Sequence, residues 1–410
     1  MHVLYVTHYF HPEVGAPQTR ILESAQRLAA HGHAVTALTG FPNYPDGVIP
    51  APYRGRLMQT EWVGPVRVIR SAVYAAPNRG FARRLLNHAS SAISSTLASP
   101  RAGPTDVVIA ESPPLFTAAA GVLIARLRRA PLVLNVADLW PESAVQLGAL
   151  RDPRAIRLAE AMERFAYRHA ALIAVPTPGM RDSLLSRGLP DERVVHLPNA
   201  VDIDRFGAAP APVGRERPRI VYSGTVGMAQ GIGTLLEAAR ILEAEGDELE
   251  FLVAGDGAER PQLEALAREW GLRSVTFAGK LPRERIPAVI GGADIAVLTL
   301  RDLPLFEDAL PSKLLEYMAA GRPVAAGAAG LVASVVEAAG AGLVTPPEDA
   351  SALAASIRRL ARDPVTAAAM GASGRRYVHE HFSRDAVVGR LERLLREVAG
   401  QPGRERVRAV

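Results

Sequence analysis

Short apolar runs alternate with amphipathic segments along almost the whole chain. The runs with strand character span residues 2–7, 34–38, 106–110, 132–136 and 171–175 in the first half and 219–223, 249–254, 275–277 and 295–298 in the second. Segments with helical spacing of apolar residues lie between them, for example residues 18–30, 234–245 and 260–270. Such alternation is typical of parallel sheets with helices on both faces, so the sequence predicts the α/β fold class.

The alternation is interrupted by a segment rich in proline, glycine and alanine at residues 207–218. A chain of 410 residues is also too long for one ordinary hydrophobic core. We therefore predict two doubly wound, Rossmann-like domains, over residues 1–203 and 204–385, that face a central cleft. Ligands of such sheets bind beyond the carboxyl ends of the strands, so the site is expected in that cleft.

Composition narrows the class of protein. Hydrophobic residues make up 48% of the chain and charged residues 22%, as in a soluble globular protein, and there is no cysteine for a disulfide or a thiolate site. The first residues read as a strand rather than as a signal peptide, and no apolar run approaches the roughly 20 residues that span a bilayer. We expect a cytoplasmic protein, or one bound peripherally to the inner face of a membrane.

The positive charge is concentrated in the first half of the chain. Residues 1–200 carry a net charge of +7 and the remainder −2, which indicates an anionic partner for the first half. The chain shows no helix-turn-helix, zinc-finger or ribonucleoprotein motif, and aromatic residues, at 5%, are too few for base-stacking platforms, so nucleic acid is not expected. A phosphorylated acceptor or an anionic membrane surface fits the charge better.

The segment with the most chemical content is residues 309–324. Pro311 is typical of a helix start and Gly321 of a helix end, so a short helix is predicted between them. Its N-terminus offers free backbone N–H groups and Lys313, which suit a phosphate, whereas Glu316 suits the hydroxyls of a sugar diol. Lys313 is one of only two lysines among 47 basic residues, although a solvated helix-start residue would look the same.

Two glycine-rich turns follow strands of the second half. Gly224 and Gly231 belong to the first turn, where glycines let the backbone approach a ligand and point N–H groups at it. The spacing matches neither the P-loop nor the dinucleotide fingerprint, and a tight strand-to-helix turn is the alternative. Gly255, after the next strand, marks a similar turn with a weaker signal.

The first half contributes polar residues that follow strands. The loop after the first strand contains His11 and Gly15, which could admit a ligand next to the backbone or simply form a surface loop. Asp138 and Glu142 could act as base, orienter or hydroxyl binder, although an Asp before a turn often only caps a helix. Glu111 ends the neighbouring strand. The histidines show no metal-ligand spacing, so neither a catalytic metal nor a cofactor is predicted.

A basic amphipathic stripe is predicted at residues 81–97. Its apolar members recur every four residues and are Phe81, Leu85, Ala89, Ile93 and Leu97. Arg79, Arg83 and Arg84 lie beside them, and a helix of this type can lie on an anionic membrane. Packing on the protein's own core is the commoner cause of such a stripe and is the preferred interpretation, because the apolar positions are mostly small.

Several segments together suggest a family. They are residues 12–17, 41–45, 138–143, 198–202, 224–233 and 311–323. At these intervals they resemble the family 4 retaining glycosyltransferases of GT-B fold, over nearly the whole chain to about residue 385. More narrowly, the chain resembles the colanic-acid and O-antigen fucosyltransferase-like branch of that family.

The resemblance implies an enzyme that moves a sugar from a nucleoside-diphosphate sugar to a lipid-linked saccharide or another glycan acceptor. It implies retention of the anomeric configuration, hexosyltransferase-type chemistry without a metal, and a role in surface polysaccharide or lipopolysaccharide biosynthesis. It also implies a final helix, within residues 386–410, that crosses back to the first domain. Three alternatives stay open: a small-molecule aglycone as acceptor, a nucleotide-sugar epimerase of the same architecture, and a non-catalytic nucleotide-sugar-binding protein.

The resemblance also assigns roles to residues. The expected catalytic residues are Asp138, Glu142 and Lys313. The expected donor-binding residues are Gly15, Ser223, Gly224, Thr225, Gln230, Gly231, Gly255, Gly279, Lys280, Asp308, Ser312, Lys313, Leu314 and Glu316. The expected acceptor-binding residues are His11, Glu111, Asp138 and Glu142. Thr225 and Gln230 stand where the broad family has an Arg and a Lys that hold the diphosphate, and Asp308 stands where it has the first of two Glu residues.

Overall fold

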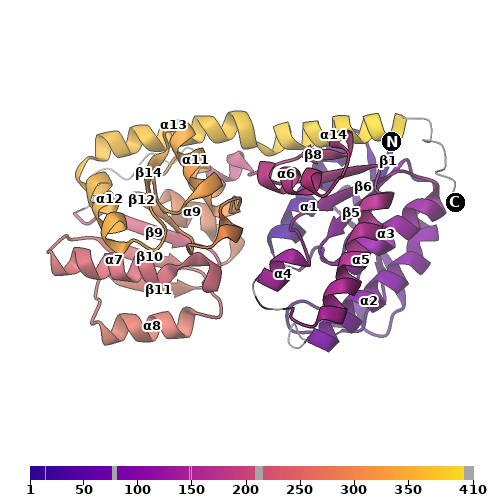
Figure 1. Cartoon of the computed structure of the whole chain (residues 1–410), viewed down its shortest axis with the longest axis horizontal. Coiled ribbons are helices and arrows are strands. Elements are labelled where there is room, and N and C mark those ends of the chain that lie inside the picture. The colour runs from indigo at the N-terminus through magenta and orange to yellow at the C-terminus, as the bar shows by residue number, and fades with distance from the viewer. Residues whose placement is uncertain (14, 76–80, 147, 149, 208–215, 401–410) are drawn as a thin grey trace. The chain divides into compact units, whose positions relative to one another are not determined.

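The computed structural model describes residues 1–13, 15–75, 81–146, 148, 150–207 and 216–400, and within them the chain forms two compact units. Unit 1 consists of residues 1–198 together with the helical segment from residue 387 onward, and unit 2 consists of residues 199–386. Each unit is a largely parallel sheet covered by helices, which confirms the predicted class of two Rossmann-like α/β domains (Figure 1).

The sheet of unit 1 has the strand order β3-β4-β2-β1-β5-β6-β7-β8. Its strands are β1 (His2–Val6), β2 (Ala34–Gly40), β3 (Met58–Val63), β4 (Val66–Ser71), β5 (Val107–Ser112), β6 (Leu132–Val136), β7 (Leu172–Val175) and β8 (Val194–His196). Its helices are α1 (Ala16–Ala30), α2 (Phe81–Ala98), α3 (Leu115–Arg128), α4 (Glu142–Gln146), α5 (Pro153–His169) and α6 (Pro178–Ser186). The pairs are parallel except β3 with β4, an antiparallel pair at one edge of the sheet.

The central strand of unit 1 is buried on both faces. Val3 and Tyr5 of β1 pack in one cluster with α1, whereas Leu4 and Val6 pack in another with α3 and α5. Because successive side chains of a strand point to opposite faces, a continuous apolar run is required at this position. This requirement explains why β1 is readable from the sequence.

The last described helix, α14 (Arg384–Gly400), belongs largely to unit 1. Its Val388, Leu391 and Leu395 pack in the same cluster as Val3 and α1. Its core contacts therefore lie on the α1 face of the unit 1 sheet.

The sheet of unit 2 is parallel and has the order β11-β10-β9-β12-β13-β14. Its strands are β9 (Arg219–Ser223), β10 (Glu250–Ala254), β11 (Val275–Gly279), β12 (Ile295–Thr299), β13 (Val324–Gly327) and β14 (Gly342–Thr345). Its helices are α7 (Ile232–Ala244), α8 (Arg260–Glu269), α9 (Ile286–Gly291), α10 (Ser312–Ala319), α11 (Gly330–Ala338), α12 (Ala350–Arg362) and α13 (Pro364–Phe382). One core cluster includes α9, α10 and α11, and the other includes α7, α8 and α12.

The apolar pattern missed the strands β3, β4, β8, β13 and β14. β8 has three residues, and β13 is composed of one valine, two alanines and a glycine, so neither is long or apolar enough for a periodic signal. β3 is only partly buried and lies at a sheet edge, where strand propensity depends strongly on context.

Candidate active site

In unit 2, three of the glycines predicted to bind the donor meet at the carboxyl ends of neighbouring strands. The N–H of Gly224, after β9, donates to the carbonyl of Ala254, and the N–H of Gly255, after β10, donates to the carbonyl of Gly279, both at 2.9 Å. A Cβ added to Gly255 would lie 1.7 Å from the Gly224 carbonyl oxygen, so the backbones are in direct contact there. This edge is where ligands of doubly wound sheets bind.

Lys313 lies against this glycine turn. Its Nζ is 2.5 Å from the phenolic oxygen of Tyr222 and 4.3 Å from the centre of the Tyr222 ring. A Cβ added to Gly224 would lie 3.1 Å from the same Nζ. Burial lowers the pKa of Lys313 to about 7, and Glu316 opposes the shift only in part. A bound phosphate would restore the charged form, because an opposite charge nearby favours it.

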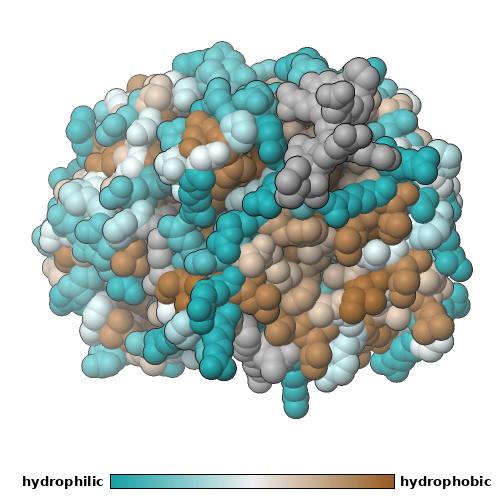
Figure 2. All heavy atoms as spheres, turned by 45° about the vertical axis from the view of Figure 1, so that its right-hand side comes forward, coloured by the Kyte–Doolittle hydropathy of each residue, from teal (hydrophilic) through white to brown (hydrophobic). Residues whose placement is uncertain are grey.

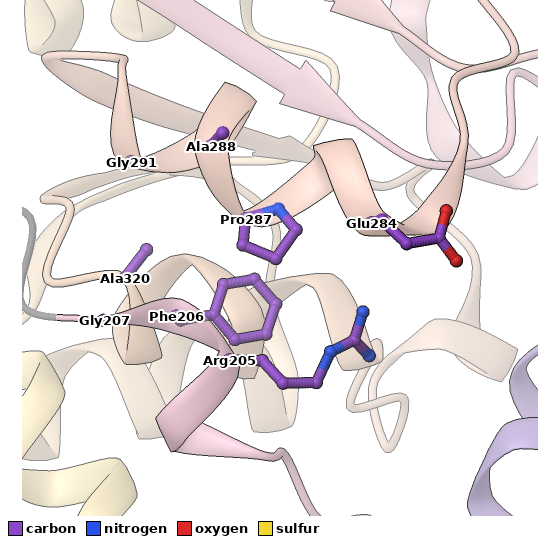
Figure 3. Close-up of a pocket in the computed structure, with 8 residues that line it drawn as sticks. All are labelled: Arg205, Phe206, Gly207, Glu284, Pro287, Ala288, Gly291 and Ala320. Carbon is purple, nitrogen blue, oxygen red and sulfur yellow. The ribbon is translucent and has the colours of Figure 1, made fainter.

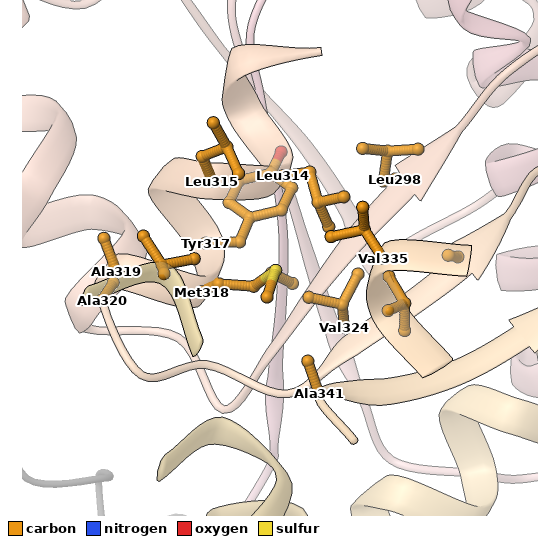
Figure 4. Close-up of a cluster of buried hydrophobic side chains, with 14 of the residues drawn as sticks. Leu298, Leu314, Leu315, Tyr317, Met318, Ala319, Ala320, Val324, Val335 and Ala341 are labelled. Atoms are coloured by element: carbon orange, nitrogen blue, oxygen red, sulfur yellow. The ribbon is translucent and has the colours of Figure 1, made fainter. Parts of the chain in front are cut away.

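The helix α10 that carries Lys313 is held rigidly by its apolar side. Leu314, Leu315, Tyr317 and Met318 are fully buried, and Figure 4 shows them packed with residues of β12, β13 and α11. The Tyr317 hydroxyl accepts from the N–H of Ser223 at 2.8 Å and donates to the carbonyl of Ser223 at 3.1 Å. The second half of α10 and the end of β9 are therefore joined directly. Of the predicted donor residues, Leu314 is a core residue rather than an exposed ligand contact.

Glu316 lies among cations. Burial raises the pKa of its carboxyl group, and Arg283, Arg205 and Lys313 each lower that pKa in turn. A carboxylate with cations around it can still accept hydrogen bonds from hydroxyl groups.

A shallow hollow of about 500 Å³ lies next to these arginines. Its lining residues are Arg205, Phe206, Gly207, Glu284, Pro287, Ala288, Gly291 and Ala320. The rings of Phe206 and Pro287 face one another there, with Arg205 and Glu284 to one side (Figure 3). None of the predicted donor residues lines this hollow. The sequence showed no signal for it, because its walls come from three segments that are far apart in the chain.

The remaining predicted donor residues of unit 2 occupy loops around the same sheet edge. Gln230 and Gly231 precede α7, and their loop is tied to the end of β12, since the Thr299 hydroxyl donates to the Gln230 carbonyl at 2.6 Å. The Thr225 carbonyl accepts from Tyr222 at 2.6 Å. Lys280 follows β11 and is exposed, Ser312 is exposed at the start of α10, and Asp308 lies in the loop before α10.

In unit 1, Glu111 is committed to an internal ion pair. It is buried at the end of β5, where Arg20 of α1 donates to it at 2.7 Å and the Asn135 amide of β6 donates at 2.9 Å. β5 and β6 pair side by side with Glu111 opposite Asn135. These contacts favour a structural role over direct acceptor binding.

Asp138 and Glu142 have different surroundings. The hydroxyl of Ser143 donates to Asp138 at 2.7 Å, and burial raises the pKa of the Asp138 carboxyl despite that bond. Glu142 is half exposed on α4 and forms an ion pair with Arg187. Asp138 therefore has the environment of a proton-transfer or hydroxyl-binding group, whereas Glu142 already has a cationic partner.

The loop after β1 is fixed by Glu13. Its carboxylate accepts from the N–H groups of Asn43 and Tyr44, each at 2.8 Å, so two segments singled out in the sequence come together. His11 is exposed, and its carbonyl accepts from Arg70.

Gly15 immediately precedes α1 as its N-cap residue. A Cβ added there would lie 2.4 Å from the Oε1 atom of Gln18, so a larger residue requires that side chain to move.

Sequence reasoning missed an aromatic cluster beside this loop. The ring of His8 lies 4.5 Å from that of Tyr9 and 4.6 Å from that of His88, and Tyr9 lies 5.2 Å from Tyr44. Burial lowers the pKa of His8 to about 3 and that of His88 to about 4, so both imidazoles are neutral near pH 7. His88 comes from α2, and its distance along the chain hid the cluster.

Among the residues that the structure describes, no group of three or more His, Cys, Asp or Glu could hold a metal ion. Within the same residues, none of the helices combines the length and apolarity needed to cross a bilayer.

Comparison with known protein families gives two matches that together cover most of the chain. The Glycosyl transferase 4-like domain matches residues 15–200, and Glycosyl transferases group 1 matches residues 209–377. These ranges contain most of the predicted site residues.

Two related sequences are similar over most of their length. The colanic acid biosynthesis glycosyl transferase WcaI of Escherichia coli (strain K12) is 30% identical over 73% of this chain and 76% of its own. The 2-deoxystreptamine glucosyltransferase of Streptomyces kanamyceticus is 30% identical over 89% of this chain and 94% of its own.

Solved structures agree on the fold. Sucrose-phosphate synthase from Thermosynechococcus elongatus has a TM-score of 0.73 at 22% identity and covers 97% of this chain and 98% of its own. Anabaena HepE, solved in complex with UDP, has a TM-score of 0.70 at 16% identity and covers 97% of this chain and 100% of its own. These neighbours share the GT-B architecture, as the sequence predicted.

Proposed function

The chain belongs to the group 1 glycosyl transferases, and on this premise we propose that it moves a sugar from a nucleoside-diphosphate sugar to a lipid-linked saccharide or another glycan acceptor. The proposal includes retention of the anomeric configuration and a role in surface polysaccharide biosynthesis. We also propose that the protein acts at the cytoplasmic side of a membrane, where lipid-linked acceptors are presented.

The observation that carries the proposal is the position of Lys313 against the glycine turn. Breaking the glycosidic bond leaves negative charge on the diphosphate while the sugar becomes oxocarbenium-like. The Lys313 ammonium and the free N–H groups at the start of α10 offer positive charge at one point of the sheet edge. Such preorganised donors stabilise a leaving group without a large rearrangement.

The neighbouring groups have supporting roles in this proposal. Glu316, whose carboxylate is compensated by Arg205 and Arg283, would accept hydrogen bonds from the ribose hydroxyls. Asp308 would contact the donor sugar from the loop before α10. The fixed glycine turn at Gly224 and Gly255 would let the diphosphate lie against the backbone.

On the acceptor side we propose Asp138 as the residue that orients the acceptor hydroxyl. Its carboxyl has a raised pKa and a fixed hydrogen bond from Ser143, so it is held in one orientation. A departing phosphate oxygen can itself take the acceptor proton, so the reaction requires no strong protein base. Charge neutralisation by Lys313 and backbone amides also requires neither a metal ion nor a cofactor.

Two variants that each remove one cation of unit 2 test the donor site. We expect Lys313→Ala to weaken nucleotide-sugar binding by about 1.5–3 kcal/mol, the contribution of a charged hydrogen bond, and to lower turnover. Arg273→Ala, which removes a 92% exposed cation just before β11, at the amino-terminal edge of the unit 2 sheet, is the control. The measurement is the melting-temperature increase on adding a panel of nucleotide sugars, followed by transfer assays. Equal donor binding by Lys313→Ala and wild type would refute the site.

The same assays separate the alternatives. Incubation of the donor without an acceptor converts the sugar if the protein is an epimerase and leaves it intact or slowly hydrolysed if the protein is a transferase. The anomeric configuration of the product, read by proton coupling constants, tests retention.

A small-molecule aglycone is the second candidate acceptor. The Streptomyces kanamyceticus relative, whose name gives 2-deoxystreptamine as acceptor, is aligned over more of this chain than the colanic acid relative at the same identity. Transfer to an aminocyclitol, but not to extracted lipid-linked saccharides, would favour this candidate.

A further inference from the structure

Four aromatic rings gather at the carboxyl ends of β1 and β2 in unit 1. They belong to His8, Tyr9, Tyr44 and His88, and we call them the ring cluster. His8 is buried, Tyr9 and His88 are half-buried, and Tyr44 is 39% exposed. The planes of neighbouring rings meet at 68–90°, so no two of them stack face to face. Three of the four rings therefore remain partly accessible from solvent.

Helix α2 presents His88 to the cluster because its aliphatic side faces outward. The structure contradicts the interpretation that the apolar stripe of α2 packs on the core. Its aliphatic residues that are 40–67% exposed are Leu85, Leu86, Ile93 and Leu97. Figure 2, in which this side of unit 1 is brought forward, shows brown side chains gathered over a broad area. The buried side of the helix carries Asn87, and the adjacent His88 meets the loop after β1.

Hydrogen bonds hold the segments of the ring cluster in place. The Thr7 hydroxyl donates to the Tyr9 carbonyl at 2.9 Å. The Asn87 amide of α2 donates at 2.9 Å to the side chain of Asn43, the residue before Tyr44. Rings whose positions are already fixed bind a ligand with little further loss of conformational freedom.

The chemistry of the ring cluster suits a neutral sugar. Aromatic faces carry partial negative charge and offer apolar area, which matches the C–H face of a pyranose ring. Burial lowers the pKa of His88 to about 4, so its imidazole is neutral near pH 7 and has one donor and one acceptor nitrogen. A sugar hydroxyl can pair with either nitrogen. The charged groups that act on Tyr9 and His88 are Arg84 and Glu13, and Glu13 is already bonded to backbone N–H groups.

The position of the cluster sets which sugar it can meet. Asp138, the proposed acceptor-orienting residue, follows β6, and only β5 lies between β6 and β1 in the sheet. Adjacent strands are about 4.8 Å apart, so the ends of β1 and β6 are separated by about 10 Å. That separation exceeds the width of one sugar ring. A sugar whose hydroxyl is oriented by Asp138 would therefore leave the cluster to the next sugar of the same acceptor.

We propose that the ring cluster is a subsite for the second sugar of a saccharide acceptor, next to the sugar that receives the transfer. The inference rests on the proposed transferase function and specifies its acceptor as a glycan of at least two linked rings. Tyr9 and Tyr44 contact the C–H face of the second sugar, and His88 pairs with one of its hydroxyls. A one-ring aminocyclitol held at Asp138 would be too short to reach these side chains.

The dependence of transfer on acceptor length tests the proposal. The probes are octyl glycosides of glucose, galactose, mannose and N-acetylglucosamine, and of disaccharides that carry each of these sugars at the non-reducing end. With the best-binding nucleotide sugar as donor, the wild type should use its preferred disaccharide with a KM about tenfold below that of the matching monosaccharide. Tyr44→Ala and His88→Ala should each raise the disaccharide KM about fivefold and leave the monosaccharide KM unchanged. Because the subsite contacts no reacting atom, kcat should stay within about twofold.

Trp62→Ala is the matched control. Trp62 is a 67% exposed aromatic residue of unit 1, but it pairs with Arg67 near the start of β4, at the opposite end of the parallel strands. This variant should retain the wild-type preference for disaccharides. Tyr44→Phe keeps the ring and should restore most of the loss seen in Tyr44→Ala. Circular dichroism melting checks the folding of each variant, and the donor-induced rise in melting temperature should be the same in all of them.

The outcomes separate the subsite from the transferase itself. Equal KM values of the wild type for both acceptor lengths, or a disaccharide KM unchanged in Tyr44→Ala and His88→Ala, would overturn the subsite and leave the transferase function standing. A loss of the disaccharide preference in Trp62→Ala would also overturn it. Absence of transfer by the wild type to every acceptor would overturn the transferase proposal and the subsite with it.

Discussion

The Nζ of Lys313 lies 2.5 Å from the phenolic oxygen of Tyr222 and 4.3 Å from the centre of its ring. The ring face and the hydroxyl both favour the ammonium, yet burial lowers the pKa of Lys313 to about 7. The hydroxyl also donates to the Thr225 carbonyl, so one side chain positions both the cation and the glycine turn. A phosphate beside Lys313 would favour its charged form.

Tyr222→Phe should weaken donor binding while leaving the fold intact. The variant keeps the ring but removes the acceptor for Lys313 and the donor to Thr225, so we expect a loss of about 1–2 kcal/mol in donor binding. Isothermal titration with the best-binding nucleotide sugar measures it. Trp270→Phe is the control. The Trp270 ring lies under Arg240 in unit 2, away from the glycine turn, so this variant should not change donor affinity. Unchanged affinity in Tyr222→Phe would show that the Tyr222 hydroxyl does not position the cation.

Donor binding should weaken as pH rises through 7. Lys313 is charged below its ligand-free pKa of about 7 and neutral above it, whereas a bound diphosphate would raise that pKa. Affinity should therefore fall by up to roughly tenfold per pH unit between about 7 and 9. Lys313→Arg keeps its charge throughout this range, so its binding should be nearly independent of pH. Parallel pH profiles for the two proteins would exclude Lys313 as the titrating group.

Gly255→Ala should destabilise unit 2 strongly. Gly255 has a φ of 158°, and an added Cβ would lie 1.7 Å from the Gly224 carbonyl oxygen, so the two turns must separate. We expect a loss of at least about 3 kcal/mol in the free energy of unfolding, measured by urea denaturation. Gly233→Ala on α7, where an added Cβ meets nothing within 4 Å, should change stability by less than about 1 kcal/mol. Similar effects of the two substitutions would refute the close backbone contact.

The docking of α14 on unit 1 should weaken in acid. Contacts with Arg396, His33 and His31 lower the pKa of Glu392 from its ordinary value to about 2. A depressed carboxyl pKa adds stability above the unfolded-state pKa, and that stability is lost as pH falls from about 4.5 to about 2. Over this pH range the free energy of unfolding of Glu392→Gln should fall less than that of the wild type. We expect a difference of only about 1 kcal/mol, because partial exposure of Glu392 weakens its ion pairs. Identical acid-unfolding curves would show that these contacts contribute nothing to stability.

Local features of the site were readable from the sequence because their causes are local. Pro311 and Gly321 mark the two ends of α10, and the glycines that follow β9 and β10 mark the turns of the sheet edge. Parallel strands buried on both faces must be continuously apolar, so most strands of both units were visible as well. The strands β8, β13 and β14 were too short to show this pattern.

Pairings between distant segments could not be predicted in this way. Lys313 meets Tyr222 across 91 residues, and His88 of α2 meets His8 of the loop after β1. Glu142 lies four residues from Asp138 in the sequence, yet it is the half-exposed partner of Arg187. Which polar groups are free to act depends on such contacts, and a contact between remote segments leaves no periodic trace in a single sequence.

The sequence by itself determined two α/β domains, the family, and the segment that carries Lys313 and Glu316, because helix ends, turns and buried strands each require particular residue types nearby. Only the tertiary structure decided which way α2 faces. Periodicity shows that Leu85, Ile93 and Leu97 share one side of a helix, but it does not say whether that side is buried. The hydrogen bonds of Asn87 and Ser95 with residues of other segments bury the polar side and leave the aliphatic side exposed.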